Sequence, residues 1–178
     1  MKQSAVKLRR GISLAALCVG IAGCASSGGY ADPSAEAKLM ATKGNNASGT
    51  VSFVMQGDRI LVNASVSGLT PGAHGFHIHE KGDCSAPDGT SAGGHFNPGG
   101  HPHGDPQMGP HHAGDMPMLD ADAGGNARLS AELRSVAFDG DKGIVGRGVI
   151  VHASPDDFKT QPTGNSGARV ACGVIVRK

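Results

Sequence analysis

The feature of this sequence that most constrains its fold is a strict alternation of apolar and polar residues in several short segments. Residues 127–134 read ARLSAELR, with a small or apolar side chain at every second position. The same spacing recurs over residues 60–66 and 170–176. Side chains two positions apart lie on the same face of an extended strand. Each segment therefore predicts a strand with one buried face and one solvated face.

Five other short segments are candidate strands: 38–42, 50–56, 74–79, 116–121 and 148–152. No stretch after residue 37 has the periodicity of a helix, and 29 glycines and 10 prolines supply turns. We therefore expect an all-β domain of eight antiparallel strands, folded as a sandwich or barrel. With five phenylalanines, one tyrosine and no tryptophan, its core should consist of valine, leucine, isoleucine and alanine.

Two long segments, residues 81–114 and 153–168, do not follow the strand pattern. Loops of this length inside a compact domain are usually functional or disordered. We expect both of them to be functional loops. Most of the histidines discussed below lie in the first one.

The first 23 residues have the features of an export signal. Four basic residues among the first ten precede an apolar run over residues 12–22, which is too short to cross a bilayer comfortably. The run ends in IAGC, which resembles the bacterial lipobox, where cleavage before the cysteine accompanies lipid attachment, here to Cys24. The alternative is an ordinary secretory signal that is cut at a nearby small residue.

The residues after the signal are small, polar and turn-forming, which is typical of a flexible tether. We therefore divide the chain into a lipoprotein signal peptide (1–23), a tether (24–37) and one domain (38–178). We expect an exported protein that is lipid-anchored through Cys24. It would lie on the periplasmic side of a bacterial membrane, with the outer membrane preferred, or at the cell surface.

Export changes the charge balance. Removing the signal takes away four of the 16 basic residues and none of the 15 acidic ones, which leaves 12 against 15 and a net charge of −3. A negative chain without basic runs has no feature that attracts nucleic acid, so we expect no nucleic-acid partner. Any attraction for an anionic substrate must be local.

Cysteine usage agrees with an oxidising compartment. Cys18 lies in the signal and Cys24 is the expected lipid site, which leaves Cys84 and Cys172. Two cysteines in an exported chain usually form a disulfide, and closing so long a loop is worth about 4 to 5 kcal/mol in the chain-entropy model. Two free buried thiols are the alternative.

The histidines carry the chemistry. His77 and His79 stand one residue apart in GFHIHEKGDC, so both imidazoles project from one face of a strand, about 6 to 7 Å apart at the backbone, and can reach one ion. A lone HxH pair is weak evidence, but more candidate ligands lie in the first long loop and at a strand end: His95, His101, His103, His111, His112, Asp115 and His152. Imidazole and carboxylate ligands suit zinc and copper(II).

The sequence resembles the copper-zinc superoxide dismutase family over almost all of the chain from residue 38. The motifs concerned are GFHIHEKGDC, GGHFNP, HHAGD, VHASPDD and GNSGARVACGVI. The resemblance implies a Greek-key barrel or sandwich of the immunoglobulin-like type, with one copper and one zinc per subunit. The implied reaction converts superoxide to dioxygen and hydrogen peroxide by alternate reduction and oxidation of a histidine-bound copper.

The resemblance also implies the metal ligands. For copper they are His77, His79, His95 and His152. For zinc they are the shared His95 and the residues at offsets +8, +17 and +20 from it, which are His103, His112 and Asp115.

Three other histidines need an explanation. His101 and His111 stand beside the expected ligands, so a one-place alignment slip would exchange them, or they bind stray metal at the loop surface. We expect His74 to be a structural hydrogen-bonding residue beneath the site.

Sharing His95 between two metals requires the loss of both ring protons, because a neutral imidazole offers only one lone pair. Two divalent cations supply the necessary acidification. The resemblance implies that the bond from His95 to copper opens when copper is reduced. The freed nitrogen then takes a proton, which it can return to the product.

Three further residues match functional positions of the family. Arg169 is expected at the rim of the copper channel, where a fixed guanidinium attracts a small anion; a surface arginine at a strand start is the alternative. Asp156 is expected to hold one copper histidine and one zinc histidine, here His77 and His103. Thr163 is expected to narrow the channel opposite Arg169.

The chain also departs from the better-known members. The loop between His152 and Arg169 is shorter than in the animal enzymes and lacks their acid and lysine cluster, so Lys159 is a candidate replacement. The segment between Cys84 and His95 has a different length, and it contributes to subunit contacts in the family. A homodimer is therefore one option, and the oligomeric state stays open.

Two alternative hypotheses are a lipoprotein that buffers copper or zinc without turnover, and a structural β-sandwich with incidental histidines. Buffering does not need Arg169 at a channel or His95 between two ions. Incidental histidines would not give seven ligands at the family's offsets. The sequence therefore favours the dismutase.

Overall fold

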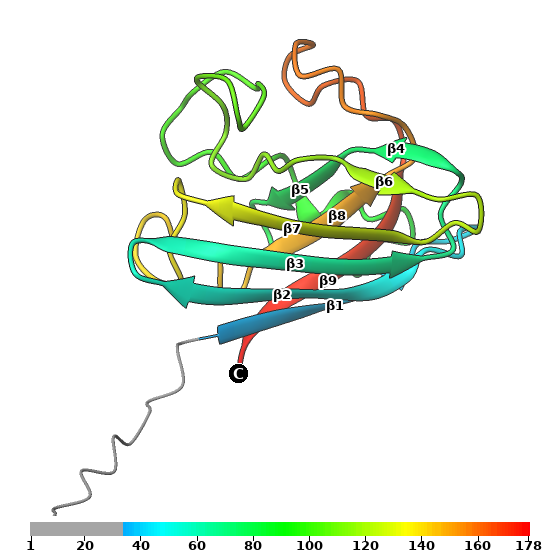
Figure 1. Ribbon diagram of the computed structural model, residues 1–178, viewed down its shortest axis with the longest axis horizontal. Coiled ribbons are helices and arrows are strands. Elements are labelled where there is room, and N and C mark those ends of the chain that lie inside the picture. The colour runs from blue at the N-terminus through cyan, green and yellow to red at the C-terminus, as the bar shows by residue number, and fades with distance from the viewer. Residues whose placement is uncertain (1–33) are drawn as a thin grey trace, which may run out of the picture. The chain divides into compact units, whose positions relative to one another are not determined.

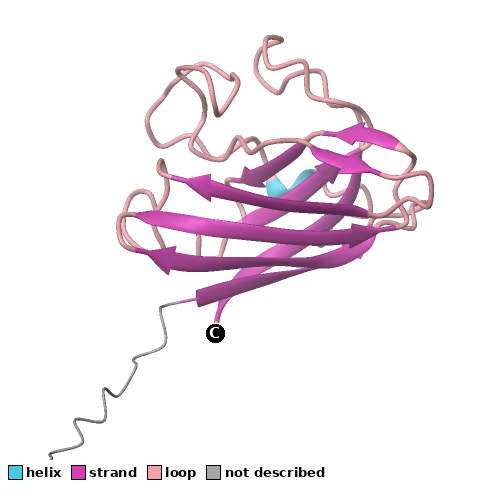
Figure 2. Cartoon of the chain, viewed as in Figure 1, coloured by secondary structure: helices cyan, strands magenta, loops and turns pink. Residues whose placement is uncertain are grey.

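The computed structural model describes residues 34–178 as nine strands and one short 3-10 helix (Figure 1, Figure 2). The strands are β1 (Ser34–Ala41), β2 (Ser48–Gln56), β3 (Arg59–Ser67), β4 (Gly72–His74), β5 (Phe76–His79), β6 (Leu119–Ala121), β7 (Ala127–Leu133), β8 (Gly148–His152) and β9 (Arg169–Arg177). The helix, η1, is Thr90–Ala92. Neighbouring strands are all paired antiparallel, as the sequence predicts.

The expected number of strands, eight, is wrong by one because the segment 74–79 is divided. β4 pairs with β6, whereas β5 pairs with β8, and Gly75 lies between them outside both strands. The backbone N–H of Gly75 donates to Ser154 O at 2.9 Å, and its carbonyl accepts from His152 N–H at 2.8 Å. A Cβ at residue 75 would lie 2.5 Å from Ser166 Oγ, so this crossing requires glycine.

The order of the strands closes the sheet. Neighbours run β4-β6-β7-β3-β2-β1-β9-β8-β5, so the two strands at the ends of this order are the two that Gly75 joins. The edges of the sheet therefore meet at one residue. The strands wrap around a common interior, with β8 and β9 crossing behind β7 and β3 (Figure 1), which is the barrel-like arrangement that the alternation predicts.

The inward-facing side chains of β3 fill part of the interior, as the alternation in its sequence predicts. Ile60, Val62, Ala64 and Val66 alternate with solvent-facing residues and are each no more than 5% exposed. The expectation of a purely aliphatic core is wrong, because four of the five phenylalanines are buried, and Phe53 has no exposed surface. A ring removes more apolar area from water than any aliphatic side chain does, so even scarce phenylalanines partition to the core.

β1 begins earlier than the expected domain boundary. Ala35 and Ala37 are buried in the core, and Ala35 pairs with both Phe53 of β2 and Arg177 of β9. Residues 34–37 are therefore strand and not tether. The rest of the expected tether, the signal peptide and Cys24 lie outside the described residues.

Two long connections without strands link β5 to β6 and β8 to β9, which agrees with the expectation for residues 81–114 and 153–168. Figure 1 draws both at the top of the view, the first in green and the second in orange. They touch, because Gln161 accepts from the His103 backbone N–H at 2.8 Å and donates to its carbonyl at 2.9 Å. Within residues 34–178, no helix is long and apolar enough to span a membrane.

Candidate metal centre

Four histidines from three parts of the fold converge beneath these two loops. His77 and His79 lie on β5, and His152 lies at the end of β8, which pairs with β5. His95 is held beside them by an isolated bridge to His79. One nitrogen from each ring lies within 4.8 Å of the others, and all four residues are buried. We call this the copper group, and the second set described below the zinc group, after the metals that the resemblance implies for them.

Each ring of the copper group leaves one nitrogen free. His79 Nδ1–H donates to Gly93 O at 2.9 Å, His152 Nδ1–H donates to Gly167 O at 3.2 Å, and His77 Nε2–H donates to Asp156. Within residues 34–178 the remaining nitrogens, His77 Nδ1, His79 Nε2, His95 Nε2 and His152 Nε2, have no hydrogen-bond partner. Buried polar atoms are rarely left unpaired, so four together fit the lone pairs of a metal site.

Burial keeps these rings neutral. Desolvation lowers the pKa of His77 and places that of His79 well below its ordinary value. Desolvation also lowers the pKa of His95 to about 4 and that of His152 to about 3, with neighbouring imidazoles adding to the effect. Because a protonated nitrogen cannot ligate, these shifts make the lone pairs available at neutral pH.

A second set of four side chains, His95, His103, His112 and Asp115, forms the zinc group. Asp115 Oδ1 lies 2.9 Å from His95 Nδ1, 3.2 Å from His103 Nδ1 and 3.5 Å from His112 Nδ1. His112 Nδ1 lies 3.4 Å from His95 Nδ1. A tetrahedron with metal-ligand bonds of about 2.0 to 2.1 Å has edges of about 3.3 Å, so the donors have the spacing that zinc requires.

Asp115 is oriented by the backbone. Its Oδ2 accepts the N–H of His112 at 2.8 Å and of Gly104 at 3.3 Å, which turns Oδ1 toward the imidazoles. Although burial opposes its ionisation, the hydrogen bonds from the three histidines hold the pKa of Asp115 well below its usual range. Burial also opposes protonation of His103, but Asp115 and Asp156 raise its pKa to about 9. The Asp115 carboxylate therefore supplies a negative charge that favours a cation, and a metal that binds His103 must displace its proton.

His95 belongs to both groups and presents a different nitrogen to each. Its Nε2 is the unpaired atom in the copper group, and its Nδ1 is the atom in the zinc group. Its ring stacks on that of His77, with the centroids 3.9 Å apart. One imidazole therefore lies between the two sets of donors, where a residue with two ring nitrogens is required.

Asp156 links the two groups by accepting a hydrogen bond from one histidine of each. Its Oδ2 accepts from His77 Nε2 at 2.6 Å, and its Oδ1 accepts from His103 Nε2 at 2.9 Å. These are the two histidines expected from the sequence. Phe158 N–H also donates to Oδ1 at 2.7 Å, with its φ at 55°. Gly164 packs so closely that a Cβ there would overlap the carboxylate, a requirement that the sequence analysis missed.

Arg169 stands at the start of β9 and is held by two carbonyl groups of the first loop. Its Nη1 donates to Gly89 O and its Nη2 donates to Gly93 O, both at 2.6 Å. Gly93 O also accepts from His79, so the guanidinium and a copper-group histidine share one acceptor. The sequence analysis did not single out Gly93. Its φ of 74° is a conformation that favours glycine, which a glycine after a short helix could have signalled.

The disulfide expected from the sequence is present. Cys84 and Cys172 are bonded, with their Cα atoms 5.8 Å apart. Cys172 lies on β9 three residues after Arg169, so the bond attaches the first loop to the strand that carries the arginine. The loop carbonyls that hold Arg169 are thereby fixed to the same strand.

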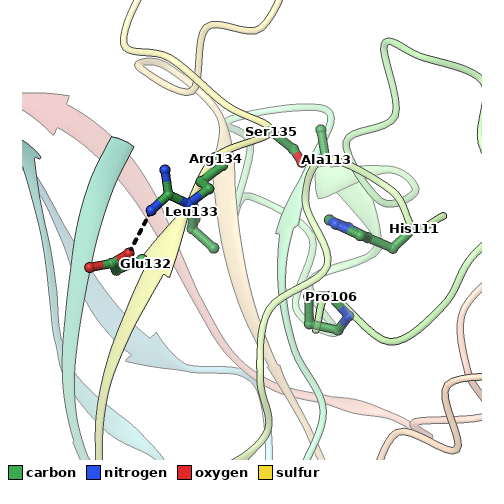
Figure 3. A pocket seen from close by; sticks show the side chains of 7 residues that line it. All are labelled: Pro106, His111, Ala113, Glu132, Leu133, Arg134 and Ser135. Carbon is green, nitrogen blue, oxygen red and sulfur yellow. Dashed lines mark hydrogen bonds and ion pairs between the residues drawn. The ribbon is translucent and has the colours of Figure 1, made fainter. Parts of the chain in front are cut away.

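The other histidines lie outside both groups. His74 is buried between two carbonyls, 2.7 Å from His152 O and 2.8 Å from Thr70 O, which is the structural role expected for it. His101 is exposed. His111 Nδ1–H donates to His112 O, and its ring lines a surface pocket of about 230 Å³ between the loop and residues 132–135 at the end of β7 (Figure 3). Neither His101 nor His111 replaces an expected ligand.

Two residues with expected roles in the channel lie on the second loop. Thr163 is half-buried, and its carbonyl accepts from Ser166 Oγ at 3.3 Å. Lys159 is exposed on the same loop. Within residues 34–178 neither side chain forms a hydrogen bond with Arg169, so the expected narrowing opposite Arg169 stays a prediction.

Known proteins resemble this chain in sequence and in structure. The family model described as copper/zinc superoxide dismutase matches residues 47–175. A superoxide dismutase [Cu-Zn] from Deinococcus radiodurans is 37% identical over 178 residues, which cover 92% of this chain and 94% of the relative. An extracellular superoxide dismutase [Cu-Zn] from Caenorhabditis elegans is 41% identical over 134 residues, 71% of this chain and 60% of that protein.

A solved structure shares the fold. The crystal structure of the clock protein EA4 superposes with a TM-score of 0.73 at 37% sequence identity, covering 83% of this chain and 97% of that one.

Proposed function

The chain belongs to the copper/zinc superoxide dismutase family, and on this premise we propose how its residues divide the work of the reaction. It is an oxidoreductase that converts superoxide to dioxygen and hydrogen peroxide with copper and zinc as cofactors. We propose His77, His79, His95 and His152 as the copper ligands. We propose His95, His103, His112 and Asp115 as the zinc ligands. The observation that carries this assignment is that two buried sets of four donors share one residue, His95.

The metals and the protein have separate tasks. Bound copper would supply one-electron redox chemistry, and bound zinc would supply charge without redox chemistry. The protein holds the lone pairs of the copper group in place through Gly93, Gly167 and Asp156. This preorganisation keeps the rings from turning when the charge at the site changes.

His95 is the proposed proton carrier. Its Nε2 is buried and without a hydrogen-bond partner within the described chain, so a proton placed there has no competing acceptor in the protein. Its Nδ1 stays in the zinc group, beside Asp115. The ring can therefore take a proton at Nε2 and deliver it to the peroxide product while its position stays constant.

Arg169 is the proposed substrate-orienting residue. Two carbonyls hold its guanidinium beside the copper group, and Gly93 O joins it to His79. The side chain keeps its positive charge under all relevant conditions and still has N–H groups to offer a small anion. It thus provides local attraction on a chain whose net charge would be −3, from 12 basic and 15 acidic residues, once residues 1–23 are removed. For Thr163 we propose that it narrows the opening.

One experiment tests the assignment. Superoxide consumption by the purified protein should be measured together with its copper and zinc content, for the wild type and for His95→Ala. Because a methyl group cannot join the two sites, we expect turnover to fall at least about a hundredfold while some copper stays bound. His101→Ala, outside both groups, is the control and should match the wild type. Unchanged turnover in His95→Ala contradicts the bridging role.

For location, we propose export and attachment by lipid at Cys24, on the periplasmic face of a bacterial membrane or at the cell surface, where the enzyme removes superoxide. The lipobox-like IAGC sequence and the disulfide support this. One relative is named an extracellular enzyme. A homodimer is a further proposal, tested by the mass of the purified protein in solution.

The lipid anchor has its own test. Cys24→Ser removes the only sulfur to which lipid would attach at this site, so the variant should move from the membrane fraction to the soluble exported fraction. Fractionation followed by immunoblotting measures this. If Cys24→Ser stays in the membrane fraction, the lipobox interpretation is wrong.

A further inference from the structure

Met118 connects the zinc group to the second loop. It stands three residues after Asp115, directly before β6, and its Sδ accepts the backbone N–H of Asp156 at 3.3 Å. The carboxylate of Asp156 in turn accepts from His77 and His103. The sulfur is therefore one residue away from a histidine of each metal group.

Met118 differs from the other methionines of the described chain. Met40 and Met108 are 69% and 82% exposed, whereas Met116 is 1% exposed. Met55 and Met118 are half-buried. Within residues 34–178, only Met118 uses its sulfur as a hydrogen-bond acceptor. It thus combines partial access to solvent with a structural role for the sulfur atom.

We propose that Met118 is a peroxide-sensitive modification site that couples accumulation of the product to loss of zinc. A sulfur lone pair attacks one oxygen of hydrogen peroxide and the O–O bond breaks. The departing hydroxide takes the proton from the new S–OH group. The products are methionine sulfoxide and water, with two electrons passing from sulfur to peroxide. The oxidant is the product of the enzyme's own reaction, so no other reagent is needed.

The geometry explains why oxidation would disturb the site. A hydrogen bond from nitrogen to a sulfoxide oxygen spans about 2.9 Å by itself. The present 3.3 Å between Asp156 N and Met118 Sδ leaves no room for an oxygen between them. Either the main chain of Asp156 moves away or the Met118 side chain turns and leaves that N–H unpaired. The first change displaces the carboxylate that orients His103, and the second removes a hydrogen bond that holds the main chain of Asp156 in place.

The expected consequence is faster zinc release. This inference rests on the zinc ligands proposed above, because His103 is one of them. Partners that orient metal ligands typically change metal affinity about 10- to 100-fold when they are lost. Sulfoxide at Met40 or Met108 should have no such effect, because both side chains are largely exposed and neither sulfur accepts a hydrogen bond within residues 34–178.

The experiment uses the full protein loaded with copper and zinc and exposed to graded hydrogen peroxide. Zinc release to a coloured chelator is followed in time, and sulfoxide at each methionine is measured by peptide mass spectrometry. The variants are Met118→Leu, which cannot be oxidised but lacks the acceptor, and Met40→Leu/Met108→Leu as the matched control. Afterwards, methionine sulfoxide reductases A and B are added, because they reverse this lesion and no other.

In the wild type and the control, zinc release should become about tenfold faster as the fraction of Met118 in the sulfoxide form increases. Reduction and reloading should restore slow release. Met118→Leu should release zinc faster than the wild type from the start, at a rate that peroxide does not change. Equal acceleration in Met118→Leu, or no recovery after reduction, overturns the proposal.

The zinc-ligand assignment and the proposed role of Met118 can be contradicted separately. An untreated wild type that holds no zinc contradicts the ligand assignment, and this proposal with it. A wild type that binds one zinc per chain, but releases it at a rate that does not change with Met118 oxidation, contradicts this proposal alone.

Discussion

At the scale of single residues, the chemistry depends on which nitrogen of each ring faces the metal. His79 and His152 donate from Nδ1 to the backbone carbonyls of Gly93 and Gly167, so Nε2 remains free. His77 is reversed, because Asp156 accepts from its Nε2. These partners hold each ring in one tautomer, which is the usual task of groups behind metal ligands.

A single substitution tests whether the positive charge of Arg169 attracts the substrate. Arg169→Glu replaces a fixed cation by an anion beside the copper group, so it should repel superoxide and slow the reaction about tenfold or more. The wild-type rate should fall as salt is added, because screening acts over about 8 to 10 Å, and the variant should show a weaker or inverted response. Rates measured across a salt series test this.

The control for Arg169→Glu is Arg128→Glu, which makes the same charge change on the exposed face of β7. Its rate and salt response should stay close to those of the wild type. If Arg169→Glu keeps the wild-type salt response, Arg169 does not steer the substrate.

At the scale of elements, the site is built where the two long loops meet the end of β5 and β8. The first loop supplies His95 and the zinc group, and the second supplies Asp156. Gln161 holds the backbone of His103 from the second loop. Neither loop contains a strand, so the contacts between the loops and the bonds from the first loop to β9 hold them, and bound metal would add to this.

Asp156→Asn tests this coupling of the loops. The amide can accept at one oxygen only and presents N–H groups where an acceptor is needed, so one of His77 and His103 loses its partner. We expect zinc affinity to fall about 10- to 100-fold, as measured by competition with a chelator. The matched control is Asp157→Asn, since Asp157 accepts from Lys159 and Thr160 and touches no metal ligand. Equal zinc affinity in the two variants would refute the role of Asp156.

At the scale of the whole domain, closure of the sheet brings distant segments together. Gly75 joins the first and last strands in the spatial order, and the disulfide joins the first loop to β9. The domain therefore has covalent and hydrogen-bonded connections across the region that carries the histidines. Long-range contacts of this kind are slow to form but resist local opening.

Removing the disulfide should lower the stability of the domain. In Cys84→Ala/Cys172→Ala, the unfolded chain regains the freedom that the bond removes, so the free energy of unfolding should fall by about 4 to 5 kcal/mol, less any strain relieved. Because the loop that carries Gly89 and Gly93 would lose its covalent attachment to β9, Arg169 should be held less firmly and turnover should also fall. Denaturant titration gives the first quantity and an activity assay the second. A loss of stability with full activity would show that the bond does not position Arg169.

Much of the fold and of the donor set could be predicted from residue order. Alternation over residues 60–66 indicated β3 and its buried face, because a strand places every second side chain inside. The seven expected ligand residues fall into the two groups of donors. Residue types alone did not select them, because His101 and His111 offer the same atoms, and the resemblance to the family supplied the choice.

Other features were decided by the tertiary structure. The division of 74–79 into β4 and β5 depends on β6 and β8, which are distant in sequence. The free nitrogen of each ring and the carbonyls that hold Arg169 likewise depend on segments that folding brings close. A sequence records which atoms a chain has, but a hydrogen bond needs its donor and acceptor within about 3 Å. For these residues, only the closed sheet and its two loops create that proximity.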